Sequence, residues 1–228
     1  MNAKSFSVAL MTLMLAAVLP AAPSTAGTCP GANVTISSAS PAERELICTG
    51  ARQALDLLGR CSVSPRRSIE VRVLREVRHP LTGVIFGYYD LHGAYIALTD
   101  LGGLPALMRD TPYEGLPHTD FYKSLVVHEV VHSVMHQNLR RPAGNQAAYE
   151  YPAYALQIAS LPAHVRTRFL QAFDAEHIRR PIPFSDVILA FAPYVFAARA
   201  YEHFTSSVDG CGSLRALVTG ESEVIPIP

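Results

Sequence analysis

The chain has 228 residues, of which 49% are hydrophobic and 17% charged, and its 19 basic and 19 acidic residues give a formal net charge of zero. This length is sufficient for one domain with a hydrophobic core. The balanced charge provides no basic surface for nucleic acid or for an anionic membrane, so we expect neither as a partner.

The first 26 residues have the features of a secretory signal peptide. Lys4 supplies a positive charge, residues 6–19 form an almost unbroken apolar run, and Ser24-Thr25-Ala26 offers small residues at the cleavage position. The apolar run is short for a membrane span, and an uncleaved anchor is the alternative. We therefore expect a secreted or periplasmic protein with a single domain over residues 27–228, a monomer that is not inserted in a membrane after cleavage.

All four cysteines follow the predicted signal peptide. An even number of cysteines in an oxidising compartment predicts two disulfide bonds, with three possible connectivities that the sequence does not separate. No Cys-x-x-Cys pair occurs, so a thiolate zinc site or a redox motif is not expected. The cysteines are Cys29, Cys48, Cys61 and Cys211.

The first half of the chain predicts one helix followed by a small sheet. Ser40 is suited to cap a helix over residues 41–60, in which Cys48 lies and after which Cys61 follows. Alternation of apolar and polar residues predicts a strand over 68–73. Two further strands, residues 84–89 and 94–99, are expected to form a hairpin.

The second half is expected to be helical. The apolar part of its last predicted helix, residues 187–198, is too short for a membrane span, which predicts a buried helix. The order of elements predicts an α+β fold with a small, mainly antiparallel sheet and a helical C-terminal half. The helices expected after the sheet cover residues 104–109, 121–139, 146–160, 163–177 and 186–204.

The segment 124–137 carries histidines at intervals of four residues, His128, His132 and His136, with Glu129 directly after the first. The segment contains no Gly or Pro and is long for a strand, which favours a helix. On a helix, side chains at i and i+4 lie on one face, so His128 and His132 can bind one metal ion while Glu129 acts as a base without ligating it. The alternative is a packed helix whose histidines have other partners.

His136 is not expected to be a ligand, because it lies about 12 Å along a straight helix from His128. A third ligand is expected from the next helix, which begins near Gln146 after a turn containing Pro142 and Gly144. In such a helical hairpin Glu150 can face His132. Candidates that carry no motif are His118, His164, Asp174, Glu176, His177 and His203.

The pattern His128-Glu-Val-Val-His132 followed by Glu150 resembles the zincin metallopeptidases, in particular the glutamate-zincin (gluzincin) branch, over residues 119–161. The resemblance implies a zincin-like fold and Zn²⁺ held by His128, His132 and Glu150. It also implies Glu129 as the catalytic base in the hydrolysis of a peptide or protein substrate. The segment from Glu150 to Gln157 further resembles a motif of small uncharacterised secreted bacterial proteins.

The chain departs from the better-known members at Tyr154, where they have an aspartate that orients a histidine ligand. Tyr154 lies one turn from Glu150, so it can either donate a hydrogen bond to the oxyanion or pack between the helices. Gln157, a further turn on, is a weaker candidate for supporting a ligand. A strand edge at 84–89 or 94–99 could bind an extended peptide, with Tyr88, Tyr89 and Tyr95 lining the cleft.

The sequence therefore predicts a secreted zinc-dependent metallopeptidase with Glu129 and Tyr154 as catalytic residues. A non-catalytic zincin-like module for zinc binding or interaction is the alternative. A disulfide-stabilised structural protein with an accidental motif is the third interpretation.

Overall fold

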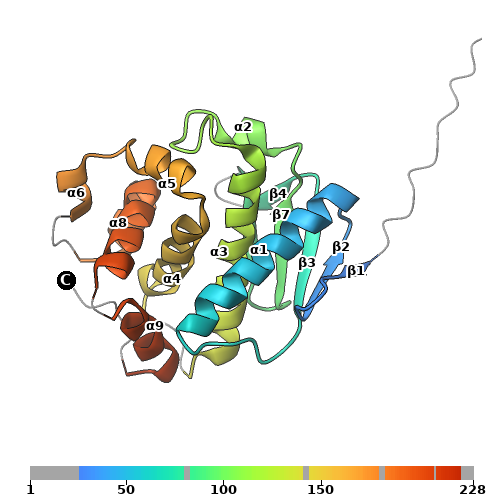
Figure 1. Cartoon of the computed structure of the whole chain (residues 1–228), viewed down its shortest axis with the longest axis horizontal. Helices are drawn as coiled ribbons and strands as arrows, with labels where there is room; N and C mark the ends of the chain where they lie inside the picture. The colour runs from blue at the N-terminus through green and yellow to red at the C-terminus, as the bar shows by residue number, and fades with distance from the viewer. Residues whose placement is uncertain (1–25, 80–82, 141–143, 180–182, 208, 222–228) are drawn as a thin grey trace, which may run out of the picture.

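The computed structural model describes residues 26–79, 83–140, 144–179, 183–207 and 209–221. The predicted signal peptide lies outside the described residues except for Ala26, as does Pro142 in the predicted turn. The described part is mixed α and β, with a small sheet and a helical C-terminal half (Figure 1).

The main sheet of the described chain has five strands in the order β1-β2-β3-β7-β6. A separate antiparallel pair is formed by β4 and β5. The strands are β1 (Gly27–Thr28), β2 (Val34–Ser37), β3 (Ile69–Leu74), β4 (Val77–His79), β5 (Gly83–Ile85), β6 (Gly87–Asp90) and β7 (Tyr95–Thr99).

The expectation of a mainly antiparallel sheet is wrong. The pairs β2–β3 and β3–β7 in the centre are parallel, and only the outer pairs β1–β2 and β6–β7 are antiparallel. The reason is a short strand, β2, that the sequence analysis did not recognise. It precedes the first helix, and parallel neighbours need a long crossover connection, which this helix supplies between β2 and β3.

The predicted hairpin is confirmed in its second half. β6 and β7 pair antiparallel across the turn at 91–94, with Tyr89 opposite Ile96. Val84 and Ile85 belong instead to β5 and pair with β4. β6 is therefore an edge strand of the main sheet, and β7 is an interior strand.

The predicted helices recur with two of them divided. The segment 163–177 forms α5 and α6. The segment 186–204 forms α7 and α8, because Pro193 begins a new helix. The helices are α1 (Pro41–Arg60), α2 (Leu104–Met108), α3 (His118–Asn138), α4 (Gln146–Ser160), α5 (Ala163–Leu170), α6 (Ala175–Arg179), α7 (Asp186–Phe191), α8 (Pro193–Ser206) and the unexpected α9 (Gly210–Thr219).

The apolar run 187–198 is only partly buried. α8 buries Phe196 and its neighbours, but α7 has no buried residue, and the side chain of Phe191 is 88% exposed. The prediction of one buried helix is therefore wrong for α7. No helix of the described chain is long and apolar enough to span a membrane.

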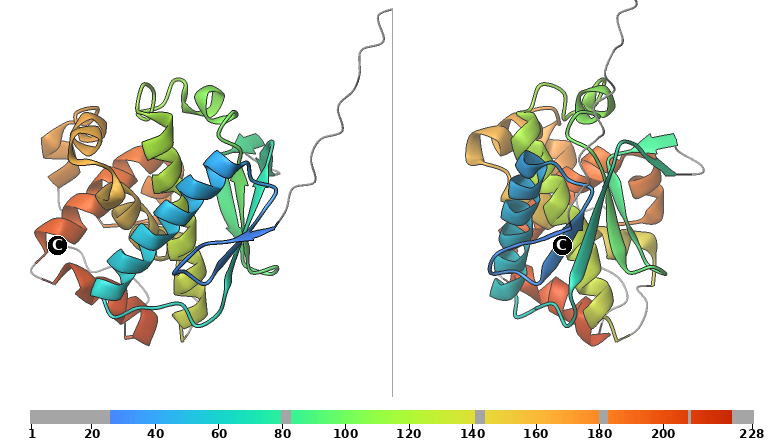
Figure 2. Two further views of the ribbon diagram at one scale, coloured as in Figure 1. Left: turned by 45° about the vertical axis from the view of Figure 1, so that its right-hand side comes forward. Right: turned by 90° about the vertical axis from the view of Figure 1, so that its right-hand side faces the viewer.

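Helix α3 occupies the centre of the molecule. It packs against α1 and the sheet on one side and against α4 on the other, and α8 covers the far side of α4 (Figures 1 and 2). The crossing with α1 is close at Gly50, where a Cβ atom would lie 2.6 Å from the carbonyl oxygen of Lys123. A polar side chain on a helix this deeply placed costs free energy unless it has a partner.

Both predicted disulfide bonds are present, and the structure decides their pairing. Cys29 is bonded to Cys48, which ties the segment between β1 and β2 to α1. Cys61 is bonded to Cys211, which ties the end of α1 to α9 across 150 residues. The bonds fit an oxidising compartment.

Candidate metal centre

The central turns of α3 bring the histidines of the motif to one face. His128 and His132 are four residues apart in a continuous helix, so their imidazoles lie one above the other, with ring centroids 4.7 Å apart. Both are buried, as is Glu129. The prediction that this segment is a helix is confirmed.

Glu150 is supplied by the second turn of α4. Asn145 caps this helix, with its Oδ1 accepting a hydrogen bond from the Ala148 N–H at 2.7 Å, and the helix continues through Pro152. Since α3 and α4 pack together as a helical hairpin, the carboxylate of Glu150 reaches both histidines.

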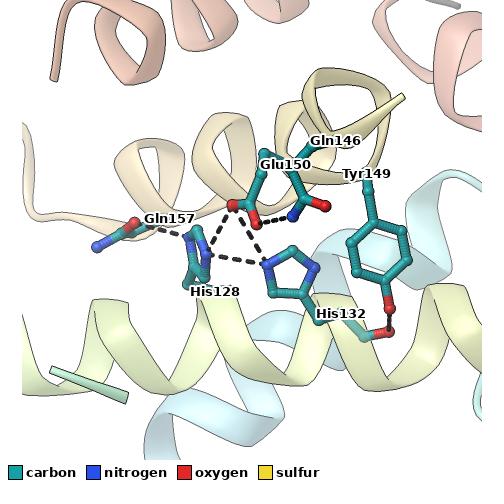
Figure 3. A network of polar contacts seen from close by, with 6 residues as sticks. All are labelled: His128, His132, Gln146, Tyr149, Glu150 and Gln157. Atoms are coloured by element: carbon teal, nitrogen blue, oxygen red, sulfur yellow. Dashed lines mark hydrogen bonds and ion pairs between the residues drawn. The ribbon is translucent and has the colours of Figure 1, made fainter. Parts of the chain in front are cut away.

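Three atoms from these residues converge on one point (Figure 3). The Nε2 atoms of His128 and His132 are 3.0 Å apart. The Oε2 atom of Glu150 lies 3.3 Å from the first and 3.4 Å from the second. These three distances form a nearly equilateral triangle of two nitrogen donors and one oxygen donor.

The triangle has the dimensions of one face of a metal tetrahedron. With bonds of about 2.0–2.1 Å to zinc, tetrahedral geometry places ligand atoms about 3.3 Å apart. Two imidazoles and one carboxylate suit a borderline divalent ion and leave a fourth position for water or substrate. The residues present therefore fit a metal ion, although the geometry alone does not choose zinc among divalent transition metals.

Two amide side chains of α4 orient the converging groups. The Nδ1–H of His128 donates to Gln157 Oε1 at 3.0 Å, which leaves its Nε2 lone pair directed to the triangle. Gln146 Nε2 donates to Glu150 Oε1 at 3.0 Å, so the other carboxylate oxygen faces the histidines. The expected supporting contact of Gln157 is thus present, whereas the role of Gln146 was not foreseen.

The ionisation of Glu150 reflects its neighbours. Burial by itself would raise the pKa of this carboxyl, but the two histidines outweigh burial and lower the pKa well below its usual range. Glu150 is therefore an anion, as a carboxylate ligand must be.

Tyrosines of α4 cover both imidazoles. Tyr154 meets the His128 ring edge to face with centroids 4.6 Å apart, and burial raises the pKa of its hydroxyl well above the ordinary value. Tyr149 stacks on His132 at 4.8 Å and donates from its hydroxyl to the backbone oxygen of His132 at 3.3 Å. Tyr149 is not among the site residues predicted from the sequence, although its position directly before Glu150 is a usable signal.

Glu129 lies beside the converging atoms but outside their triangle. It is 5% exposed, and its Oε2 has no hydrogen-bond partner among the described residues. Burial raises the pKa of this carboxyl to about 7. Gly87 of the edge strand passes close by, because a Cβ atom there would lie 3.5 Å from Glu129 Oε1.

A pocket of about 1060 Å³ opens over these groups. Its walls come from β6 and the following turn, from α3, from the start of α4 and from the α7–α8 segment. Gly87, Tyr88 and Tyr89 of the edge strand line it, as do Glu129, Tyr149 and Tyr154. Tyr95 instead lies near the Tyr88 hydroxyl, with the two oxygens 3.2 Å apart.

The remaining sequence candidates do not join the three converging atoms. His136 lines the pocket, and its Nδ1 lies 2.8 Å from the Tyr89 hydroxyl, which agrees with a supporting role rather than ligation. The group that could hold an ion among the described residues contains none of His118, His164, Asp174, Glu176 and His203. The side chain of His177 lies outside the described part.

Comparison with known proteins places the chain in a family. The family DUF6639, a family of unknown function, matches residues 34–225. The chain belongs to this family. No curated protein and no solved structure matches it. The match begins at β2 and includes the rest of the sheet, α3, α4 and the helices that follow, so it covers every residue of the candidate centre.

Proposed function

We propose that this member of DUF6639 is an exported zinc-dependent peptidase of the zincin type. One observation carries the proposal: His128, His132 and Glu150 converge with the spacing of a tetrahedral site, and the buried carboxylate of Glu129 lies beside them in an open pocket. A buried carboxylate without a hydrogen-bond partner lowers the free energy of unfolding. Such a residue is therefore more readily explained by a role in catalysis than by a role in core packing.

Zinc bound by His128, His132 and Glu150 would polarise the scissile carbonyl and make a water molecule more acidic. Glu129 accepts the proton of the attacking water and then delivers it to the leaving amine. Burial, which raises the pKa of this carboxyl in the metal-free site, favours the protonated form that the second transfer requires. Tyr154, whose hydroxyl keeps its proton, is the candidate donor to the oxyanion.

The substrate would lie along the edge strand β6. This strand pairs with β7 on one side only and lines the pocket through Gly87, Tyr88 and Tyr89. An extended peptide can therefore add to the sheet edge by backbone hydrogen bonds. Gly87 has no side chain to separate that peptide from Glu129.

The test combines metal content with hydrolysis. The mature protein is expected to hold one zinc ion per chain and to cleave members of a peptide library. His132→Ala and Glu150→Ala should lose most of the zinc, because each removes one of three ligands. Glu129→Gln should keep the zinc and lose hydrolysis by at least ~100-fold, because it removes only the base.

Asp174→Asn serves as a matched control, since it alters a carboxylate outside the three converging residues. Zinc binding without hydrolysis of any peptide would favour a non-catalytic zinc-binding module. A wild-type protein that takes up no zinc after reconstitution would contradict both the peptidase and the zinc-binding module.

A further inference from the structure

Charged side chains are unevenly distributed along the pocket. Among the described residues, the only carboxylates in its lining are Glu129 and Glu150, both at the metal centre. Beyond His132 the lining continues with His136 and Arg140. The carboxylates of the pocket therefore lie only where a divalent cation would balance their negative charge. The other end of the pocket carries hydrogen-bond donors and a positive charge.

His136 lies on the face of α3 that carries His128 and His132, because residues four apart on a helix share one face, about 6 Å apart along the axis. Arg140 follows two residues after the end of α3, where the backbone at Leu139 is no longer helical, and it lines the same pocket. An extended peptide rises about 3.3 Å per residue. A substrate with its scissile bond at the metal centre would thus present a group roughly two to four residues away to His136 and Arg140.

His136 is held in place from the edge strand. The Tyr89 hydroxyl lies 2.8 Å from its Nδ1, and the two rings are 5.6 Å apart. When that hydroxyl donates to Nδ1, the ring proton resides on Nε2. The half-buried imidazole then offers an Nε2–H donor to a ligand in the pocket.

Arg140 supplies the positive charge. Its side chain is exposed, and none of the described carboxylates forms an ion pair with it. Its backbone is fixed against α9, because its N–H donates to the Val218 oxygen at 3.3 Å. A guanidinium is planar and always charged, and it matches the two oxygens of a carboxylate.

The nearby start of α4 does not compete for an anion. The Ala147 N–H donates to Asp186 Oδ1 at 2.7 Å, and the Ala148 N–H donates to Asn145. Those backbone donors are already satisfied, and Asp186 is not part of the pocket lining. An anion at this end of the pocket would accordingly be held by side chains.

We infer that His136 and Arg140 form a carboxylate-binding subsite that selects acidic substrates. The inference rests on the peptidase proposal and deepens it by naming the substrate class. The carboxylate can come from an acidic side chain two to four residues from the scissile bond, or from the C-terminus of a peptide at that distance. The first source predicts cleavage within chains, and the second predicts cleavage near their ends.

Binding to the zinc-loaded Glu129→Gln protein separates these sources without requiring turnover. Three fluorescent pools of short random peptides are compared by anisotropy: one with a fixed Glu and an amidated C-terminus, one with Gln at that position and an amidated C-terminus, and one with Gln and a free C-terminal carboxylate. We expect one carboxylate pool to bind about three- to tenfold more tightly than the neutral pool.

Adding Arg140→Gln or His136→Gln should reduce the preference for the carboxylate pool. With Arg140→Gln, the ratio of the two affinities should be close to one. Arg109→Gln is the matched control, because Arg109 is also exposed but lies outside the pocket. Equal binding of the three pools, or a preference that survives Arg140→Gln, would overturn the subsite.

The two proposals fail independently. A carboxylate preference that depends on Arg140, in a protein that hydrolyses nothing, would keep the subsite and reject the peptidase. Hydrolysis of neutral and acidic peptides at equal rates, with equal binding of the pools, would keep the peptidase and reject the subsite.

Discussion

The contact between His128 and Gln157 illustrates how single residues prepare the candidate centre. Gln157 is 2% exposed and stands between the buried apolar residues Leu156 and Ile158 of α4. A buried amide costs free energy unless its polar atoms are hydrogen-bonded. The His128 Nδ1–H is the partner of its oxygen, so the two side chains satisfy and orient each other.

Gln157→Leu is expected to weaken zinc binding by about 10–100-fold, because the imidazole of His128 loses the acceptor that fixes its tautomer and orientation. The affinity can be measured by competition with a chelator. Gln157→Glu restores an acceptor and should recover most of the affinity. An equal loss in Gln171→Leu, where the glutamine is exposed outside the pocket, would show that the effect is not local.

Helices α1 and α4 both begin with a side-chain cap, but the two caps differ in what they position. At α1, Ser40 Oγ accepts from the Glu43 N–H at 3.3 Å, and the Glu43 carboxylate accepts from the Ser40 N–H at 2.8 Å. At α4, Asn145 caps the first turn. Only α4 carries a residue of the metal centre, since Glu150 lies just beyond that first turn.

Ser40→Ala and Asn145→Ala should each lower the free energy of unfolding by about 1 kcal/mol, because each leaves a helix N–H without its partner. Denaturant unfolding of the metal-free proteins measures this loss. Asn145→Ala should in addition weaken zinc binding, whereas Ser40→Ala should not. Equal zinc affinities in the two variants would mean that the start of α4 does not help to position Glu150.

The whole molecule is closed by two disulfide bonds of very different span. Cys29–Cys48 encloses a separation of 19 residues, and Cys61–Cys211 encloses 150. The longer bond joins α1 to α9, and α9 in turn contacts Arg140 after α3. The covalent frame therefore connects the first helix with the end of the proposed substrate pocket.

Removal of the longer bond should cost more stability than removal of the shorter one. The chain-entropy relation gives about 5 kcal/mol for Cys61→Ser with Cys211→Ser and about 3 kcal/mol for Cys29→Ser with Cys48→Ser. Chemical denaturation of the two double variants checks this order. The reverse order would show that contacts in the unfolded chain outweigh loop entropy.

The sequence by itself determined the elements whose signals are local. The range 41–60 follows from a cap, a proline and a helical repeat, and the observed α1 begins and ends at those residues. The range 146–160 likewise equals α4. The placement of His128 and His132 on one face required only the helical period of α3, which neighbouring residues fix.

Only the tertiary structure decided the features that depend on distant segments. The parallel centre of the sheet requires β2, a short strand with a weak pattern of its own, to lie beside β3. The disulfide pairing, the contact of Gln157 with His128 and the contact of Tyr89 with His136 each join elements that are distant in the sequence, and no local pattern predicts that they meet. The physical reason is that propensity and periodicity act over a few residues, whereas packing of α3 between the sheet and α4 selects among many long-range arrangements.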